Sequence, residues 1–215
     1  MGAFLTVHLT INSTILHGQE AFQTAVDGLH LLAKVGLLTA VEIVFIFVPI
    51  LFHAVLGVQI WLSGQMNVAA HTYGGNIRYT LQRIAGLITI AFILYHLWHV
   101  HWLGKPFGGG SFDPHDAAAT AAAALEPWYL RLLYGIGVLA AVFHLANGVW
   151  TFLITWGVTV GANSQRWVGY VCAAFGIVLG LAGLGALNGF GSLSPEKQQE
   201  RQATGHMVVR VDDAS

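Results

Sequence analysis

Residues 41–58 read VEIVFIFVPILFHAVLGV, an apolar stretch that holds a single acid, Glu42, and a single histidine, His53. Burying a polar ring in hydrocarbon without a partner costs about 1–3 kcal/mol. A histidine in the middle of such a stretch therefore indicates that its ring has a partner. About 20 apolar residues in a helix cross the hydrocarbon core of a bilayer, so this stretch and its flanks predict a membrane-spanning helix.

The whole chain has the composition of a membrane protein. Of its 215 residues, 55% are hydrophobic and only 9% are charged, whereas a soluble domain carries about 25% charged residues. The chain holds five charge-poor apolar runs, and the last four are long enough to span a bilayer. The first run is too short to do so, and we therefore expect the true N-terminus of the protein to lie upstream of Met1. We predict an all-α fold, a five-helix transmembrane bundle over 1–190 with a polar, disordered tail over 191–215. The five runs are 1–16, 35–62, 79–103, 129–157 and 167–190.

The charges in the loops predict the orientation of the bundle. Arg78 and Arg83 lie at the boundary between the second and third runs, Arg166 lies between the fourth and fifth, and neither boundary region holds an acid. Basic loops face the cytoplasm, which predicts a cytoplasmic N-terminus and an external C-terminus. We treat the segment between the first two runs as a loop, and 108–127 as an external loop with a short surface helix.

Three further apolar runs each hold a histidine in their interior: His8, His96 and His144. Two imidazoles are what a six-coordinate haem iron needs above and below its plane. Counting residues to the helix ends places His8 and His96 in the outer half of the membrane and His53 and His144 further in. The sequence therefore predicts two b-type haems, the outer iron held by His8 and His96 and the inner iron by His53 and His144.

Other residues acquire expected roles from these positions. Gly57 and Gly148 each follow an inner ligand by four residues, on the same helix face, and would leave room for a flat macrocycle. Arg83 is expected to pair with a haem propionate. Glu42 is an acid inside the membrane and is expected to pass protons to a quinone. His99 and His101 are expected at the membrane boundary, with proton relay or propionate contact as their functional alternatives. His99 is also a competitor of His96 for the outer iron.

A cofactor-free reading of the four histidines stays open. In a transporter or proton channel, polar side chains within the spans bond to neighbouring helices or carry protons. A reduced-minus-oxidised spectrum separates this class from a cytochrome. Cys172 is the single cysteine of the chain, so neither an intrachain disulfide nor a cysteine zinc site is expected.

Six stretches resemble the cytochrome b558 membrane-anchor subunits of bacterial succinate dehydrogenase, the single-subunit, two-haem type that is related to fumarate reductase anchors. They are HGQEAF (17–22), VEIVFIFVPILFHAVLGV (41–58), LQRIAGLITI (81–90), YHLWHV (95–100), VFHLANGVWTFLITWGVTV (142–160) and NSQR (163–166).

This resemblance implies two bis-histidine b haems on the same four histidines, in the cytoplasmic membrane of a bacterium. It implies an iron–sulfur subunit and a flavoprotein on the cytoplasmic side, where succinate is oxidised, and menaquinone or another quinone as the electron acceptor. It places the quinone chemistry near the outer haem, and so near Glu42. The alternatives are a fumarate reductase working in the reverse direction and the dihaem anchor of a hydrogenase or formate dehydrogenase.

Overall fold

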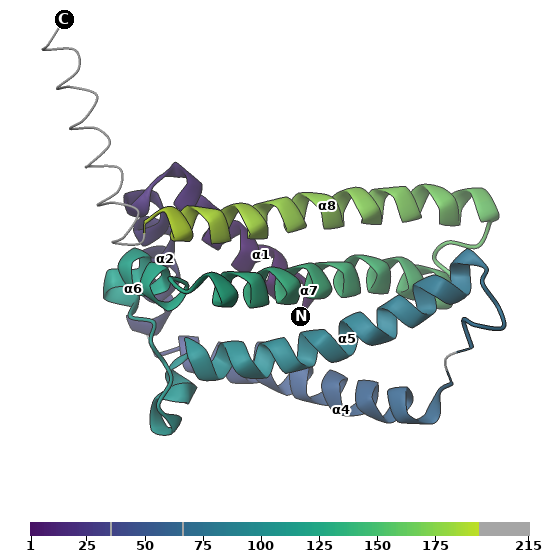
Figure 1. Ribbon diagram of the computed structural model, residues 1–215, viewed down its shortest axis with the longest axis horizontal. Coiled ribbons are helices and arrows are strands. Elements are labelled where there is room, and N and C mark those ends of the chain that lie inside the picture. Colours follow the sequence, from purple (N-terminus) through teal and green to yellow (C-terminus); the bar gives the residue numbers. More distant parts are fainter. Residues whose placement is uncertain (35, 66, 194–215) are drawn as a thin grey trace, which may run out of the picture.

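The computed structural model describes residues 1–34, 36–65 and 67–193, and the elements in these ranges are all helical (Figure 1). The predicted tail lies outside the described residues from 194 onward. In chain order the elements are α1 (Gly2–Ser13), the 3-10 turn Thr14–His17, α2 (Gln19–Lys34), α3 (Leu38–Val41), the π-helical segment Glu42–Phe47, α4 (Val48–Ser63), α5 (Gly74–His99), the 3-10 segments Trp102–Phe107 and Pro114–Asp116, α6 (Ala117–Ala124), α7 (Trp128–Thr155) and α8 (Ala162–Ser192).

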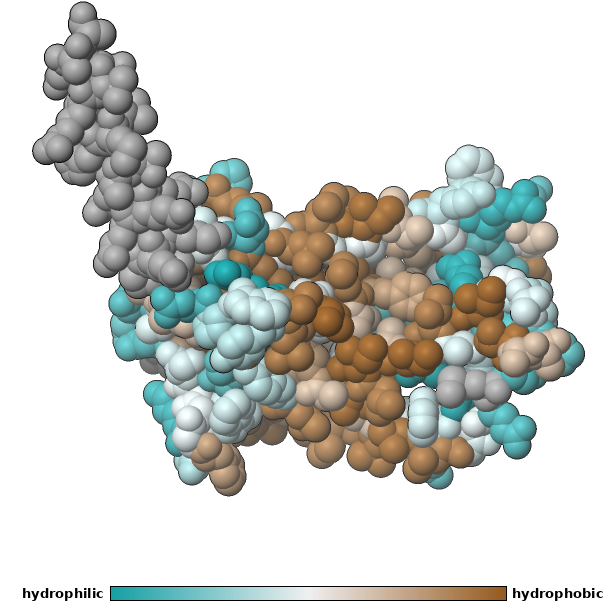
Figure 2. Space-filling model, in the orientation of Figure 1, coloured by the Kyte–Doolittle hydropathy of each residue, from teal (hydrophilic) through white to brown (hydrophobic). Residues whose placement is uncertain are grey.

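Within the described ranges, four helical stretches are long and apolar enough to cross a membrane: Thr39–Ser63, Gly74–His99, Trp128–Thr155 and Ala162–Ser192. This confirms the all-helical, membrane-spanning class. The helix α1 has 12 residues, which make about 18 Å of helix against about 30 Å of hydrocarbon. Apolar side chains form a band across the middle of the molecule, and hydrophilic ones gather at both ends (Figure 2).

The long helices run side by side in alternating directions. The helices α1, α5 and α8 run one way, and α4 and α7 run the other (Figure 1). We call the end of the bundle at which α5 ends and α7 begins the Glu42 end, and the opposite end the Arg78 end. The helix α7 is central, because it packs along both α5 and α8, and α1 packs along α8.

Two segments at the Glu42 end differ from the sequence-based expectation. The supposed loop after the first run contains α2, which buries Phe22 and Val26 one turn apart. The expected surface helix is present as α6, but Ala117 and Ala122 are buried against α2 and α8. The loop assignment failed because α2 is amphipathic and shorter than a membrane span. Both helices close this end of the bundle.

The helix α4 is the most loosely packed of the long helices. None of the residues of α4 is buried, and the long helix that its backbone contacts is α5. The π-helical segment lies directly before it, and Pro49 has no N–H to donate to Phe45. Segments of π-helix occur frequently at functional sites, and this one carries Glu42 toward the interior.

We expect Gly137→Ala to destabilise the bundle through the contact between α5 and α7. A Cβ at this position would overlap the ring of Phe92, which packs against both His96 and Tyr134. Overpacking of this kind costs about 1–3 kcal/mol, so the purified complex should unfold at a lower temperature. Gly135→Ala is the matched control, since its Cβ would lie 3.7 Å from Leu184 Cδ2. Equal melting temperatures for the two variants would contradict this packing.

Candidate haem-binding centre

The structure brings the rings of His53 and His144 together between α4 and α7. Their ring centres lie 6.0 Å apart, with the ring planes at 73° to one another. His53 is exposed, within a helix that is apolar throughout, and it has no hydrogen-bond partner among the described residues. The helices that carry the two histidines make no extensive backbone contact with each other, so it is these side chains that approach across the gap between α4 and α7.

The second pair, His8 and His96, joins α1 to α5 in the same manner. Their ring centres lie 5.8 Å apart at an interplanar angle of 79°. His96 Nδ1 is buried and has no hydrogen-bond partner among the described atoms. Asn12 Nδ2 lies 3.5 Å from His8 Nε2, too far to hold the ring firmly.

The two pairs lie at different levels of the bundle. The His53–His144 pair lies beside Gln82 of α5, whereas His96 belongs to the other end of the same helix. From Gln82 to His96 an α-helix rises about 21 Å. The pairs therefore occupy the two halves of the bundle, His53–His144 toward the Arg78 end and His8–His96 toward the Glu42 end.

Both pairs suit a metal held between two imidazoles. A metal–imidazole bond is about 2 Å long, so two rings on opposite sides of one ion have centres about 6 Å apart. Each ring can turn about its bond to the metal, so interplanar angles near 75° are allowed. The described residues contain no group of three or more His, Cys, Asp or Glu side chains suited to a metal. Each pair offers two imidazole nitrogens, which is a donor set that would suit a haem iron, whose remaining ligands come from the porphyrin.

A partly buried polar network fixes the orientation of His144. Its Nδ1 lies 3.1 Å from the carbonyl oxygen of Gln82 and donates to it, which leaves Nε2 free to ligate a metal. The Gln82 side chain donates to the His144 carbonyl at 3.0 Å and accepts from Asn147 Nδ2 at 2.9 Å. A Cβ at Gly86 would lie 2.9 Å from His144 Cε1, so this glycine makes room for the ring.

The predicted propionate residue Arg83 links α4 to α5. It donates to the Tyr79 hydroxyl at 2.6 Å and to the carbonyls of Trp61 and Gly64. Its Nε and the indole nitrogen of Trp61 are both buried and have no partner among the described atoms. Two such donors at one helix contact suit an anionic group, because a buried unpaired donor is costly.

The two glycines that were expected to make room for a macrocycle have different surroundings. A Cβ at Gly57 would meet no described atom within 4 Å, whereas a Cβ at Gly148 would lie 3.3 Å from Gln82 Nε2. Gly57 therefore borders open space one turn after His53. Gly148 is constrained by the Gln82 network.

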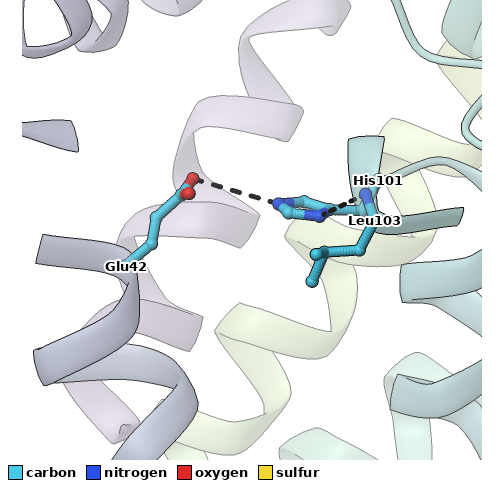
Figure 3. Close-up of polar contacts among 3 residues, drawn as sticks. All are labelled: Glu42, His101 and Leu103. Carbon is cyan, nitrogen blue, oxygen red and sulfur yellow. Dashed lines mark hydrogen bonds and ion pairs between the residues drawn. The ribbon is translucent and has the colours of Figure 1, made fainter. Parts of the chain in front are cut away.

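At the other end of the bundle, the structure pairs Glu42 with His101. Glu42 Oε1 lies 4.0 Å from His101 Nε2, and the carboxylate reaches from the π-helical segment toward the imidazole (Figure 3). The Leu103 N–H donates to His101 Nδ1 at 3.3 Å, so the neutral ring carries its proton on Nε2, toward Glu42. Burial lowers the pKa of His101, and the Glu42 carboxylate opposes this shift.

His99 occupies a separate position on α5. Its Nδ1 lies 2.8 Å from the Tyr134 hydroxyl, and its ring stacks on Tyr95 with centres 5.2 Å apart. The described ring contacts of His8 are with His96 and Phe4, so His99 does not replace His96 as the partner of His8.

Several residues of the site were not found by sequence reasoning. Gln82 hydrogen-bonds to His144, and Asn147 hydrogen-bonds to the Gln82 side chain. The sequence did hold one clue to Asn147, because it follows the histidine by three residues on the same helix face. Gln82 and Trp61 left no comparable signal, whereas His101 was expected at the membrane boundary with proton relay as one functional alternative, and its pairing with Glu42 was not foreseen. Their roles depend on how separate helices meet.

Comparison with known proteins gives this geometry a family. No protein-family model matches the chain. The succinate dehydrogenase cytochrome b558 subunit of Bacillus subtilis (strain 168) is 34% identical to it over 190 residues, which cover 88% of this chain and 90% of that relative. Identity at this level over nearly the full length of both chains confirms the resemblance noted in the sequence. The chain belongs to the family of succinate dehydrogenase cytochrome b558 subunits, membrane anchors of succinate:quinone oxidoreductase.

Proposed function

We propose that this chain carries electrons through a membrane, from the hydrophilic subunits of a succinate dehydrogenase to a quinone. The observation that supports this most directly is the presence of two facing histidine pairs at two levels of the bundle. We assign a b-type haem to each pair, with α1 as the fifth helix of the membrane domain that supplies His8. Bound haem provides one-electron redox chemistry at its iron.

The protein's own residues set the environment of each haem. For the inner haem, the Gln82 carbonyl holds His144 in the tautomer that presents Nε2. Arg83 and the Trp61 indole are placed to pair with propionates, and Gly57 leaves space beside His53. For the outer haem, His8 and His96 are the ligands.

We assign proton delivery to the Glu42 end. Glu42 and His101 lie side by side, and His101 holds its Nε2 proton toward the carboxylate. Quinone reduction consumes protons, and a carboxylate with an adjacent imidazole is suited to supply them. Glu42 is the proposed catalytic acid: in its protonated form it gives its proton to the quinone and takes another from solvent, while the His101 Nε2–H faces and stabilises the carboxylate left behind. His99 is a second candidate through its contact with Tyr134.

The orientation follows from the arginines. Arg78, Arg83 and Arg166 all lie toward the Arg78 end, which we assign to the cytoplasm. The iron–sulfur subunit and the flavoprotein would dock there, next to the inner haem. Electrons would then move outward, toward a menaquinone or another quinone near Glu42.

Haem quantitation on the purified complex tests this function. We expect two protohaems per copy of this chain, an α-band typical of b cytochromes in the reduced-minus-oxidised spectrum, and reduction of both haems by succinate. A complex without haem would overturn the proposal and favour a transporter or channel. Haems that are reduced by hydrogen or formate, but not by succinate, would overturn the assignment of the partner.

A further inference from the structure

A cavity at the Arg78 end takes no part in the function proposed above. It has a volume of about 530 Å³ and lies where the start of α5, the end of α7 and the start of α8 meet. The side chains that characterise it are two arginines, two large aromatic residues and one amide: Arg78, Arg166, Trp150, Tyr170 and Gln165. The helix α7 lies between α5 and α8 in the bundle (Figure 1), and all three helices contribute to the lining of the cavity.

One of the two guanidinium groups is held in a fixed position. Arg78 stacks on Trp150, with its Cζ 3.8 Å from the ring centre, and its Nε donates to Asn147 Oδ1 at 3.2 Å. Trp150 is itself fixed, since its indole N–H donates to the Gln165 carbonyl at 2.7 Å. The terminal nitrogens of Arg78 have no further hydrogen-bond partner among the described residues, so they remain available as donors.

The second arginine gives the cavity its net positive charge. Arg166 is exposed, and it forms no ion pair or hydrogen bond with any described residue. No acidic side chain lines the cavity. Two guanidinium groups at one opening, one of them held rigidly, form a site for a phosphate oxyanion.

Below the arginines, the same face of the protein becomes entirely apolar. Arg166, Tyr170, Ala173 and Ile177 follow at spacings of four, three and four residues, so they share one face of α8. On α7 the corresponding face carries the exposed side chain of Leu139 together with Phe143, and it ends at Trp150. A ligand in the cavity would thus have its charge at the arginines and an apolar strip beneath it.

We propose that this cavity binds the phosphate-bearing headgroup of an anionic phospholipid, whose acyl chains lie along α7 between α5 and α8. A headgroup between basic side chains and acyl chains on apolar side chains is the arrangement expected of a basic pocket between membrane helices. Trp150 and Tyr170 lie at the level where aromatic side chains favour the headgroup region. The assignment does not depend on haem. Along α7, Asn147 lies between His144 and the cavity residue Trp150, and His144 does not line the cavity.

The test compares lipid retention by the complete complex with and without Arg166. The complex is purified, reconstituted in nanodiscs of phosphatidylcholine with added phosphatidylglycerol, and analysed by native mass spectrometry for retained lipid. We expect a retained phosphatidylglycerol that R166Q reduces by about tenfold or more, since a charge-assisted bond is lost. R131Q removes the same charge at the Glu42 end and should retain the lipid fully. R166Q breaks no described internal bond, unlike R78Q, so loss of the lipid would not reflect misfolding.

Four outcomes would overturn the proposal. Equal retention of phosphatidylglycerol by R166Q and the unchanged complex would place the lipid elsewhere. Equal retention of phosphatidylcholine would show that the arginines do not select a charged headgroup. Displacement by millimolar inorganic phosphate would identify a site for a soluble anion. A photo-crosslinker at Tyr170 that captured a partner subunit instead of lipid would identify a protein interface.

Discussion

Replacement of His53 by alanine is expected to lower the haem content of the complex from two per chain to one. The ring centres of His53 and His144 lie 6.0 Å apart, and in the proposed assignment His53 supplies one of the two protein ligands of the inner haem. The His8–His96 pair lies in the other half of the bundle and should keep its haem. Succinate-driven quinone reduction should fall to background, because electrons enter on the side of the missing haem. Succinate oxidation with a water-soluble dye should continue on the partner subunits.

Haem quantitation and redox titration measure this result, with His71→Ala as the matched control. His71 is an exposed histidine in the turn between α4 and α5, at the same end of the bundle. Its loss should leave both haems in place. If His53→Ala lost both haems while the chain remained in the membrane, or lost neither, the pairing of His53 with His144 would be refuted.

Replacement of Glu42 by glutamine is expected to slow quinone reduction by about 100-fold, the range that a single proton-transferring group contributes. Both haems should stay bound and should still be reduced by succinate, because Glu42 is a proposed ligand of neither haem. The remaining activity should also respond differently to pH. The carboxylate opposes the burial that lowers the pKa of His101, so without it His101 gives up its proton at lower pH. The pH optimum of the remaining activity should move down.

Steady-state rates over a pH series, with haem spectra on the same samples, measure both effects. Glu126→Gln is the control, because Glu126 is an exposed acid between α6 and α7, outside the long helices. It should change neither the rate nor the pH profile. A Glu42→Gln complex with an unchanged rate would exclude Glu42 as the catalytic acid.

The proximity of the histidine pairs could be predicted from sequence because two simple quantities determine it. The apolar runs give the positions of the spans, and the basic residues around Arg78 and Arg166 give their directions. Together these quantities place His8 level with His96, and His53 level with His144. The structure brings these side chains together, and the role of all four as iron ligands stays a prediction.

The remainder depends on contacts that no local pattern reports. The helix α2 escaped notice because Phe22 and Val26 belong to a short amphipathic helix rather than to a span. The partnership of Glu42 with His101 requires the chain to turn just after α5, which follows from tertiary structure. Gln82 stands out as a polar residue on a mostly apolar helix. Only the position of α7 beside α5, however, shows that the backbone carbonyl of Gln82 accepts a hydrogen bond from His144 Nδ1.

The loose packing of α4 has a consequence for how the protein is made. No residue of this helix is buried, and His53 is its link to α7. A haem bound between His53 and His144 would then hold α4 against the rest of the bundle. Newly synthesised chains without haem should therefore be degraded selectively by membrane proteases. Pulse-chase labelling in cells starved of porphyrin precursor should accordingly show a shortened lifetime, which would couple the abundance of the anchor to tetrapyrrole biosynthesis.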